Sequence, residues 1–328
     1  MTVLVTGGAG YVGAHAMREL RRAGIACVAL DNLVRGHRES IPPDDLIVGD
    51  VGDPSLVSRV LADRQISAVM HFAAYAYVGE SVVHPAMYYA NNVGSTINLL
   101  RCMVDTDVRT IVFSSTCSTY GWPESISIRE DHPQQPVNPY GASKLMVERV
   151  LRDFDQAYGF RHVALRYFNA AGADPEGGIG ELHEPETHLV PLVLQTALGL
   201  RENVSVFGTD YDTPDGTCIR DYVHVSDLAS AHVLALQYLT AGGRSDCFNL
   251  GNGEGFSVRE VIETARGITG CKIASLDAPR RPGDPDRLVS NSAKAHATLG
   301  WKPKHASLRS IVATAWDWHR NLSQKKET

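Results

Sequence analysis

Short apolar runs alternate with longer amphipathic stretches through the first half of the chain. The apolar runs predict strands at residues 2–6, 25–30, 46–48, 68–72, 110–115 and 162–166. The amphipathic stretches between them predict helices at residues 11–23, 54–63, 88–104 and 140–158. Strands that alternate with helices pair in parallel, and strands that are apolar along their whole length are buried on both faces. The pattern therefore predicts an α/β fold with a doubly wound parallel sheet of the Rossmann type.

The second half of the chain is less regular. Glycine and proline gather at residues 172–191, 209–216 and 279–285, which is typical of binding loops. Helices are predicted at residues 189–200, 225–239, 257–269 and 308–319. We expect a smaller C-terminal α/β lobe that binds the substrate.

Composition and charge narrow the class of protein. The chain has 328 residues, of which 44% are hydrophobic and 21% charged, and its formal net charge is −6. Such a chain can bury a large core, but it has no general attraction for nucleic acid or an anionic membrane. Because no apolar run is long enough to span a bilayer, we expect no membrane segment. Six cysteines without a Cys-x-x-Cys pair, and a start without a signal-peptide pattern, indicate reduced thiols and a cytoplasmic protein.

A glycine-rich turn follows the first predicted strand and opens the first predicted helix. Gly7, Gly10 and Gly13 lack a Cβ, so the backbone can approach a pyrophosphate at the helix N-terminus. Asp31 ends the second strand, where a carboxylate binds an adenosine ribose and disfavours a 2′-phosphate. The motif therefore predicts NAD rather than NADP, although Arg35 lies close by. The alternative is a purely structural turn, with Asp31 as a local cap.

Two further strand ends face the same crevice in a doubly wound sheet. Asp50 follows the third predicted strand, and we expect it to reach the adenine. Residues 72–74 end the fourth strand, and their backbone would pass along the cofactor. Helix capping by Asp50 and sheet packing by Phe72 are the alternatives.

The candidate catalytic groups lie near the fifth strand. Thr116 is part of a Ser/Thr-rich strand end, and Tyr140 and Lys144 lie four residues apart at the start of a predicted helix. Residues four apart share one helix face, and an ammonium beside a phenol favours the phenolate. We therefore predict that Lys144 lowers the pKa of Tyr140, which acts as a base near neutral pH. Taken alone, the pair would indicate only two neighbours on a helix surface.

Together these motifs resemble the extended short-chain dehydrogenase/reductase family, and within it the UDP-glucose 4-epimerases. The resemblance spans nearly the whole chain and rests on residues 6–13, 31–33, 49–50, 78–81, 88–92, 114–121, 138–144, 166–169, 206–211, 220–225 and 278–284. It implies a Rossmann domain that binds NAD, made of residues 1–168 and 222–250. It also implies a nucleotide-sugar lobe made of residues 169–221 and 251–328.

The resemblance further implies a reaction on a UDP-sugar. Tyr140 takes the proton of the sugar 4-hydroxyl while hydride passes from C4 to tightly bound NAD, and hydride then returns to the other face of the 4-keto sugar. Thr116 binds the reacting oxygen, and Lys144 also holds the nicotinamide ribose. The implied cofactor-binding residues are Gly7, Gly10, Tyr11, Val12, Gly13, Asp31, Asn32, Asp50, Val51, Phe72, Ala73, Ala74, Asn91, Ser114, Tyr140, Lys144 and Tyr167.

In the C-terminal lobe, the resemblance implies two arginines that clamp the sugar diphosphate, which suits the planar fork of guanidinium. Arg220 and Arg281 hold these positions, and Asp284 would bind the uridine ribose. Without the resemblance, both arginines would be interpreted as solvated loop residues. The implied substrate-binding residues are Thr116, Asn169, His188, Leu189, Phe207, Arg220, Tyr222, Arg281 and Asp284.

Three positions differ from common versions of the family, so the sugar that the enzyme prefers is not determined by the resemblance. Ala76 replaces a lysine near the pyrophosphate, and His188 replaces an asparagine beside Leu189. Leu288 stands where a large aromatic side chain would restrict N-acetylated sugars. Residues 76–81 and 115–120 also resemble the UDP-xylose/UDP-arabinose 4-epimerases. A pentose epimerase and a UDP-N-acetylglucosamine 4-epimerase therefore remain alternatives.

Other classes of protein are less well supported. A nucleotide-sugar dehydratase would carry Asp-Glu after the catalytic hydroxyl, whereas Cys117 and Ser118 follow Thr116. A net dehydrogenase is a further alternative, and the intact Tyr140 and Lys144 argue against a non-catalytic NAD-binding protein. The family also implies a homodimer, in which helices from residues 92–104 and 140–158 pair across the interface.

One run of side chains resembles a metal-binding motif. Residues 183–188 read His-Glu-Pro-Glu-Thr-His. The two histidines are five apart with a proline between them, so they cannot share a helix face as a His-Glu-x-x-His zinc motif requires. We therefore expect no metal.

Overall fold

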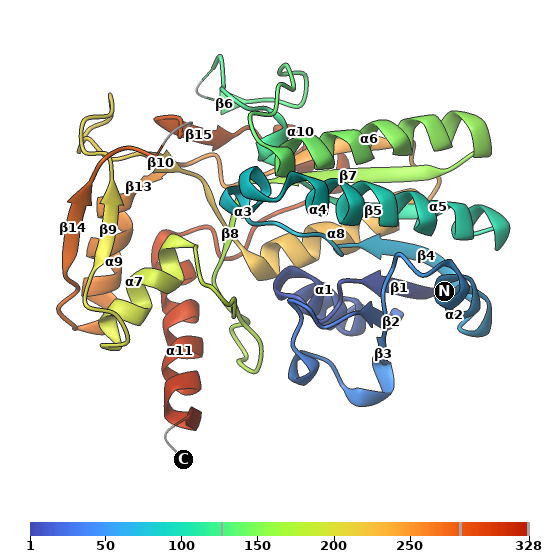
Figure 1. The fold of residues 1–328 in the computed structure, drawn as a ribbon, viewed down its shortest axis with the longest axis horizontal. Helices are drawn as coiled ribbons and strands as arrows, with labels where there is room; N and C mark the ends of the chain where they lie inside the picture. Colours follow the sequence, from blue (N-terminus) through green and yellow to red (C-terminus); the bar gives the residue numbers. More distant parts are fainter. Residues whose placement is uncertain (126, 282–283, 327–328) are drawn as a thin grey trace.

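The structure is a computed structural model that describes residues 1–125, 127–281 and 284–326 (Figure 1). Seven parallel strands form the main sheet in the order β12-β7-β5-β4-β1-β2-β3. Their bounds are β1 Thr2–Thr6, β2 Ala26–Asp31, β3 Leu46–Val48, β4 Ile66–His71, β5 Thr110–Thr116, β7 Arg161–Tyr167 and β12 Asp246–Leu250. The strand order reverses between β1 and β4, and ligands of doubly wound folds bind at such a point. The predicted fold class is confirmed.

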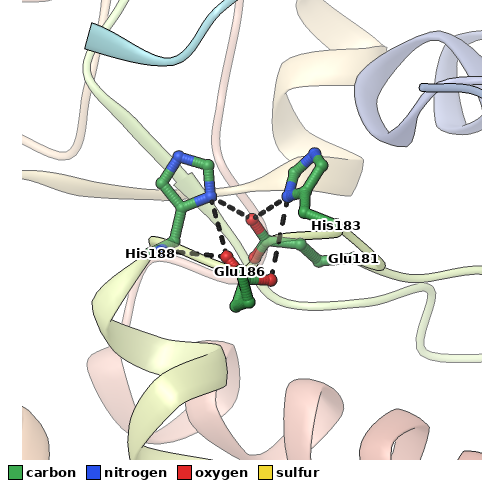
Figure 2. A group of neighbouring side chains, drawn as sticks. All are labelled: Glu181, His183, Glu186 and His188. Carbon is green, nitrogen blue, oxygen red and sulfur yellow. Dashed lines mark hydrogen bonds and ion pairs between the residues drawn. The ribbon is translucent and has the colours of Figure 1, made fainter. Parts of the chain in front are cut away.

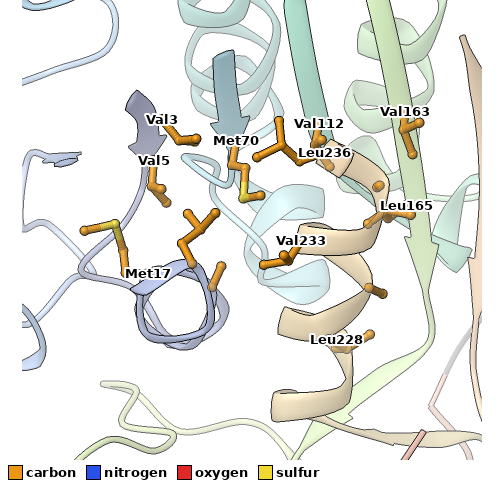
Figure 3. Packing of buried hydrophobic residues seen from close by; sticks show 14 of the residues in the cluster. Val3, Val5, Met17, Met70, Val112, Val163, Leu165, Leu228, Val233 and Leu236 are labelled. Atoms are coloured by element: carbon orange, nitrogen blue, oxygen red, sulfur yellow. The ribbon is translucent and has the colours of Figure 1, made fainter. Parts of the chain in front are cut away.

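Helices cover both faces of this sheet. On one face, α1 (Tyr11–Arg22) and α8 (Val225–Thr240) bury an apolar cluster against the strands, with Met17 and Leu236 among its fully buried members (Figure 3). On the other face lie α2 (Pro54–Asp63), α5 (Ser95–Asp105) and α6 (Pro139–Tyr158). Burial of each such side chain stabilises the fold by about 1.5–3 kcal/mol. The two cores hold the strand ends in fixed positions.

The helix that carries the candidate base has clear local signals. Asn138 caps α6 by accepting a hydrogen bond from the backbone N–H of Gly141, and Pro139 occupies the first turn. Gly159 ends the helix in the left-handed conformation, with φ at +70°. These signals fix the start of the helix, so Tyr140 and Lys144 lie in its first two turns.

The smaller lobe lies at the carboxyl ends of the main strands (Figure 1). It contains a four-stranded sheet in the order β13-β10-β15-β6 and two strand pairs, β11 with β8 and β14 with β9. Its strands are β6 Ser127–Ile128, β8 Asn169–Ala171, β9 Val204–Phe207, β10 Ile219–Arg220, β11 Tyr222–His224, β13 Phe256–Ser257, β14 Ser275–Ala278 and β15 Arg287–Ser290. Its helices are α7 Leu189–Ala197, α9 Val258–Thr269 and α11 Leu308–Lys326, whose buried side chains form a third apolar cluster.

Three segments pack outside the part of the chain in which they were expected. Strands β6 and β11, both expected in the Rossmann domain, pair with β15 and β8 of the smaller lobe. Conversely, α10 (Ala293–Leu299) and Trp301 pack into the apolar core on the α1 and α8 face of the main sheet. The division of the chain into domains stays a prediction, and these segments show that the two parts share contacts beyond it.

The stretch predicted as one helix over residues 88–104 is helical throughout, but it is not α-helical throughout. It consists of α4 (Pro85–Tyr88), a π-helical turn η3 (Tyr89–Gly94) and α5, preceded by the short helix α3 (Val78–Val83). A π-turn adds one residue and re-aims the side chains that follow it, often at functional sites. Asn91 and Asn92 lie in this turn.

The remaining sequence expectations concern thiols and membranes. All six cysteines are free. Among the helices of the described residues, none is both long and apolar enough to cross a membrane.

Candidate active site

The glycine turn between β1 and α1 packs too tightly for side chains. A Cβ on Gly7 would lie 2.6 Å from the backbone nitrogen of Ala73, and φ of Gly7 is +70°. A Cβ on Gly13 would lie 2.2 Å from the carbonyl oxygen of Gly7. Helix α1 begins at Tyr11, and no side chain caps it. Its free N–H groups can therefore bind an anion such as a pyrophosphate.

A cleft opens above this turn at the carboxyl ends of the strands. Nine of the expected cofactor residues line it: Gly7, Gly10, Asp31, Asn32, Val51, Phe72, Ala73, Ala74 and Asn91. Asp31 both lines the cleft and holds the turn, because its carboxylate accepts hydrogen bonds from the backbone N–H groups of Ala9 and Leu33 at 2.9 and 2.8 Å. Asp50 lies at its edge and accepts a hydrogen bond from Asn32 at 2.8 Å.

Arg35 also lines the cleft. A free guanidinium at this position would bind the 2′-phosphate of NADP. The guanidinium is instead occupied: one nitrogen lies 2.9 Å from Glu80 and another donates to the carbonyl oxygen of Glu184 at 2.7 Å. The ring of Tyr77 stacks against the same group. With Arg35 occupied and Asp31 in the cleft, the site favours NAD.

The expected catalytic residues meet at the end of β5. We call Ser114, Thr116, Tyr140, Lys144 and Tyr167 the strand-end cluster. The Lys144 ammonium donates to the carbonyl oxygen of Ser114 at 2.8 Å, and the hydroxyls of Ser114 and Tyr167 are 2.6 Å apart. Thr116 and Tyr140 are 5% and 9% exposed, so their hydroxyls lie in a largely desolvated site. This arrangement can position a proton acceptor beside a reacting hydroxyl group.

The predicted effect of Lys144 on the pKa of Tyr140 is wrong for the protein alone. Burial raises the pKa of Tyr140 well above its usual value, and interaction with the Thr116 hydroxyl only partly offsets this. Burial also lowers the pKa of Lys144, to about 7. Desolvation disfavours the charged form of each group and is the largest cause of both shifts. A phenolate at Tyr140 therefore needs more positive charge than Lys144 provides.

A buried ion pair beneath the cluster was missed by sequence reasoning. Glu148 on α6 and Arg166 on β7 are both 4% exposed and lie 2.6 Å apart. Glu148 also accepts a hydrogen bond from Ser115 at 2.6 Å, and Arg166 donates to the hydroxyl of Tyr120 at 2.9 Å. This network ties the helix that carries Tyr140 to the strand that carries Thr116. A Glu eight residues after Tyr140 gives no sequence signal of its own, because its role depends on a partner in another element.

Asn92 is a second residue that sequence reasoning missed. Its side chain is 2% exposed, accepts from the backbone N–H of Tyr75, and donates to the carbonyl oxygen of Tyr75 and the hydroxyl of Ser143. Ser143 in turn donates to the carbonyl oxygen of Tyr140. The expected contact residue, Asn91, lines the cleft, whereas Asn92 connects the cleft wall to α6.

In the smaller lobe, the expected diphosphate-binding residues gather in one place. Arg220 forms an ion pair with Asp284, whose other carboxylate oxygen lies 3.1 Å from Arg281. The Arg281 guanidinium stacks over the ring of Phe207 at 5.1 Å. The positive charge of the two arginines is therefore only partly balanced, which suits an anionic ligand.

The other expected substrate residues lie on the elements around these. Asn169 begins β8 and donates to the carbonyl oxygen of Asp221 at 3.0 Å, next to Tyr222 on β11. His188 caps the start of α7 through its backbone, and Leu189 is the first residue of that helix. Leu288 packs in a small apolar cluster that includes Cys117. The same cluster contains the rings of Tyr120 and Phe168.

The run of residues 183–188 does not form a helix. It is a loop, and together with Glu181 it brings two imidazoles and two carboxylates within 4.8 Å of one another (Figure 2). The expectation that no metal binds rested on helical spacing, which does not apply to a loop. Glu181, outside the run, was not considered as a partner.

Comparison with known proteins decides the family. The sequence profile of the NAD dependent epimerase/dehydratase family matches residues 3–251. The chain belongs to this family. It is 52% identical over 320 residues to UDP-glucose 4-epimerase of Halalkalibacterium halodurans, a match that covers 98% of this chain and 96% of the relative.

Two solved structures agree closely with the fold of this family member. The crystal structure of UDP-glucose 4-epimerase from Brucella ovis in complex with NAD has a TM-score of 0.94 and 46% identity, covering 96% of this chain and 97% of that one. The UDP-glucose-4-epimerase of Stenotrophomonas maltophila, with bound NAD and formylated UDP-arabinopyranose, has a TM-score of 0.96 and 39% identity, covering 99% of each chain. The family depends on NAD, and the bare glycine turn, the uncapped α1 and the Asp31 carboxylate of this chain fit that cofactor.

Proposed function

We propose that the chain is an NAD-dependent enzyme that interconverts UDP-glucose and UDP-galactose by inverting C4 of the sugar. The observation that carries this proposal is the strand-end cluster next to the cofactor cleft, in a chain about half identical to UDP-glucose 4-epimerases over its full length. Bound NAD would supply the acceptor and donor of the C4 hydride.

The residues of the chain would handle the proton and the orientation of the sugar. Tyr140 takes the proton of the 4-hydroxyl as hydride leaves C4, and returns it when hydride comes back to the opposite face. Thr116 donates a hydrogen bond to the same oxygen and limits its movement. Lys144, fixed by the carbonyl of Ser114, lies ready to hold the nicotinamide ribose.

This assignment also accounts for the high pKa of Tyr140 in the protein alone. The nicotinamide of oxidised NAD carries a positive charge, and a positive charge close to a phenol favours the phenolate. Tyr140 would therefore become a competent base only when oxidised cofactor is bound, and a proton acceptor near neutral pH is what the reaction needs.

The smaller lobe would hold the UDP part. Arg220 and Arg281 bind the diphosphate, while Asp284 exchanges its contacts with them for the uridine ribose. Phe207 is 38% exposed and, with Leu189, offers an apolar contact to the uracil ring. Binding energy from this remote part positions the sugar over Tyr140.

A pentose substrate is a second candidate, because the Stenotrophomonas relative binds a UDP-arabinopyranose derivative. Cys117 and Leu288 carry neither a charge nor a large ring. Neither side chain would therefore select for a hexose through contacts with C5, and neither would exclude a larger sugar.

A purified sample should be assayed side by side on UDP-galactose, UDP-N-acetylgalactosamine and UDP-arabinose. We expect the highest kcat/KM with UDP-galactose. A higher value with UDP-arabinose would assign the chain to the pentose branch, and a 4-keto-6-deoxy product would contradict the proposal.

We also propose a homodimer that functions in the cytoplasm. The helices expected at the interface, α5 and α6, lie side by side on one face of the main sheet (Figure 1). On this surface Met146 of α6 is 46% exposed, and Val82 and Val83 of the adjacent α3 are 61% and 71% exposed. Such an apolar surface suits a contact between two copies.

A further inference from the structure

The loop between β8 and α7 contains a group of four ionisable side chains, of which only His188 is expected to contact the substrate. The Nδ1 atoms of His183 and His188 both point at Oε1 of Glu181, at 3.2 and 2.6 Å (Figure 2). The two oxygens of Glu186 face one imidazole each: Oε2 lies 3.8 Å from Nδ1 of His183, and Oε1 lies 3.5 Å from Nδ1 of His188. Two imidazole nitrogens and two carboxylates thus face one another.

These distances fit a tetrahedral cation site. With metal–ligand bonds of about 2.0–2.1 Å, as zinc makes to nitrogen and oxygen, the edges of a tetrahedron measure about 3.3 Å. The nitrogen–oxygen distances above lie around this value, from 2.6 to 3.8 Å, and one ligand atom from each of the four residues lies within 4.8 Å of the other three. Binding of an ion would draw the more widely separated atoms together.

Two of the atoms that face the centre form no hydrogen bond of good geometry among the described residues. They are Oε1 of Glu181, a residue that is only 3% exposed, and Nδ1 of His183. Within the group, Oε1 of Glu181 has only its ion-pair contacts with the two imidazoles, whereas Oε1 of Glu186 also accepts from the backbone N–H groups of Thr187 and His188. A buried carboxylate oxygen without a well-formed hydrogen bond costs free energy, and a bound cation would offset that cost.

The electrostatics of the group also call for positive charge. Burial alone would lower the pKa of His183, but the hydrogen bonds and charges of Glu181 and Glu186 raise it to about 9. The same carboxylates raise the pKa of His188 to about 10 against the effect of burial. Two carboxylates thus attract two positive charges, which either two protons or one divalent cation can provide.

We propose that Glu181, His183, Glu186 and His188 bind a divalent transition-metal ion with zinc-like coordination. Two imidazoles and two carboxylates suit Zn²⁺ or Co²⁺ better than Mg²⁺ or Ca²⁺, which prefer oxygen ligands alone. Because all four ligands come from the protein, the ion is structural and leaves no open position for a substrate.

The ion would fix a loop that connects the two halves of the molecule. The backbone of this loop is already held from the Rossmann side, where Arg35 and His37 donate to the carbonyl oxygens of Glu184 and Leu182 at 2.7 and 2.8 Å. From the other side, Trp318 of α11 donates to the carbonyl oxygen of Glu181 at 2.9 Å. A cation at the centre would link these hydrogen-bonded parts of the loop to His188, the residue that precedes α7.

Co²⁺ titration into the chelator-treated protein tests the site, because tetrahedral Co²⁺ absorbs visible light strongly. We expect one Co²⁺ per chain, displaced by Zn²⁺, and a higher Tm with the metal. Glu181→Gln and His183→Gln each remove one ligand, and should weaken binding by more than the roughly 10–100-fold that loss of an outer-shell partner costs. If one variant does not fold, the other still gives the answer.

His84→Gln is the matched control, since His84 is an exposed histidine far along the chain from the loop. It should bind Co²⁺ as the unchanged protein does. The proposal is overturned if the protein binds no Co²⁺ with a tetrahedral spectrum, in which case the group is a set of His–Glu ion pairs. It is equally overturned if Glu181→Gln, His183→Gln and His84→Gln all bind Co²⁺ alike. The spectrum and stoichiometry do not depend on epimerase activity, so this result is separate from the proposed function.

Discussion

Burial is the property that sets the chemistry of single residues in this site. Tyr140 and Lys144 are 9% and 4% exposed, and desolvation raises the pKa of one and lowers that of the other. Each side chain is therefore held in its neutral form more strongly than in water. In the proposed mechanism, the positive charge of the oxidised cofactor would favour the phenolate and so link proton transfer to its presence.

Replacement of the candidate base should lower the rate of epimerisation without affecting cofactor binding. Tyr140→Phe removes the hydroxyl that takes the proton, so we expect kcat to fall by about 10²–10⁴-fold while bound NAD is retained. Tyr158→Phe is the control, because Tyr158 lies on the same helix and is 50% exposed. A coupled assay of UDP-glucose formation and the NAD content of the purified protein measure both effects. Undiminished epimerisation by Tyr140→Phe would refute the assignment of the base.

Residues of a local motif can be placed from the sequence. Gly7 and Asp31 were expected at the crevice because turns and strand ends lie there in such a fold, and both line the cleft. The role of Thr116 was implied by the family resemblance and stays a prediction. Glu148 and Asn92 were missed, because their roles come only from partners that are distant in sequence. The pKa of Tyr140 was predicted in the wrong direction, since spacing along a helix does not reveal the extent of burial.

At the level of elements, buried polar contacts on two sides of α6 fix its position against its neighbours. Glu148 pairs with Arg166 of β7, and Ser143 bonds to Asn92 of the π-turn η3. Periodicity predicted α6 correctly and predicted one helix over residues 88–104. A π-turn has no distinct hydrophobic pattern, so the change from α-helix to π-helix at residues 89–94 could not be predicted from the sequence.

The ion pair between α6 and β7 should be important for stability. Glu148→Gln leaves the Arg166 charge buried without its partner, which costs about 3–5 kcal/mol of unfolding free energy. Arg149→Gln, which breaks an exposed pair with Asp153 on the same helix, should cost about 0–1 kcal/mol. Urea unfolding monitored by circular dichroism measures both. Equal losses for the two variants would show that the buried pair does not hold the elements together.

The same pair gives a pH dependence with a defined sign. Burial tends to raise the pKa of Glu148, but Arg166 and the hydroxyl of Ser115 hold it below its usual value. A carboxylate with a lowered pKa in the folded state contributes stability above its unfolded pKa of about 4.3 and loses it as the pH falls. The difference in unfolding free energy between the unchanged protein and Glu148→Gln should therefore shrink between pH 6 and pH 3. A constant difference over this range would contradict the assigned charge state.

The π-turn should matter for cofactor retention. Asn92→Ala removes two hydrogen bonds to the backbone of Tyr75, which lines the cleft, and one to Ser143. We expect NAD to dissociate about tenfold or more faster, because a buried backbone group left unpaired costs about 1–3 kcal/mol. Asn98→Ala, which removes one longer contact of 3.3 Å to the carbonyl of Gly52, is the control. The release rate of the reduced cofactor, followed by its fluorescence, distinguishes the two variants, and equal rates would argue against a role for η3.

At the scale of the whole molecule, the two lobes are joined by buried polar contacts as well as by the chain. Tyr11 of α1 donates to the carbonyl oxygen of Gly172 at 2.7 Å, and Arg18 and Arg22 pair with the buried Asp174. These links fix the cofactor turn relative to the loop that leads to α7. The strand and helix alternation predicted the main sheet, but it could not predict that β6 and α10 would cross the expected division, because such pairings depend on tertiary contacts.

The proposed dimer is tested through the exposed surface of α6. We expect light scattering to give twice the chain mass of 35.7 kDa. Met146→Glu places a charge in the proposed interface and should shift the protein toward a monomer, because an unpaired charge buried at an interface is costly. Leu276→Glu is the control, since Leu276 is 58% exposed on β14 in the smaller lobe. A monomeric mass for the unchanged protein would rule out the dimer.

The central claim is that the chain inverts C4 of a UDP-sugar by passing a hydride to its bound cofactor and back, without exchange with solvent. Incubation of the purified protein with UDP-galactose in D₂O, without added NAD, tests this directly by proton NMR. The account predicts a mixture of UDP-galactose and UDP-glucose that keeps its protium at C4, because the hydride is returned and not exchanged with solvent. Deuterium at C4, or no UDP-glucose at all, would contradict it.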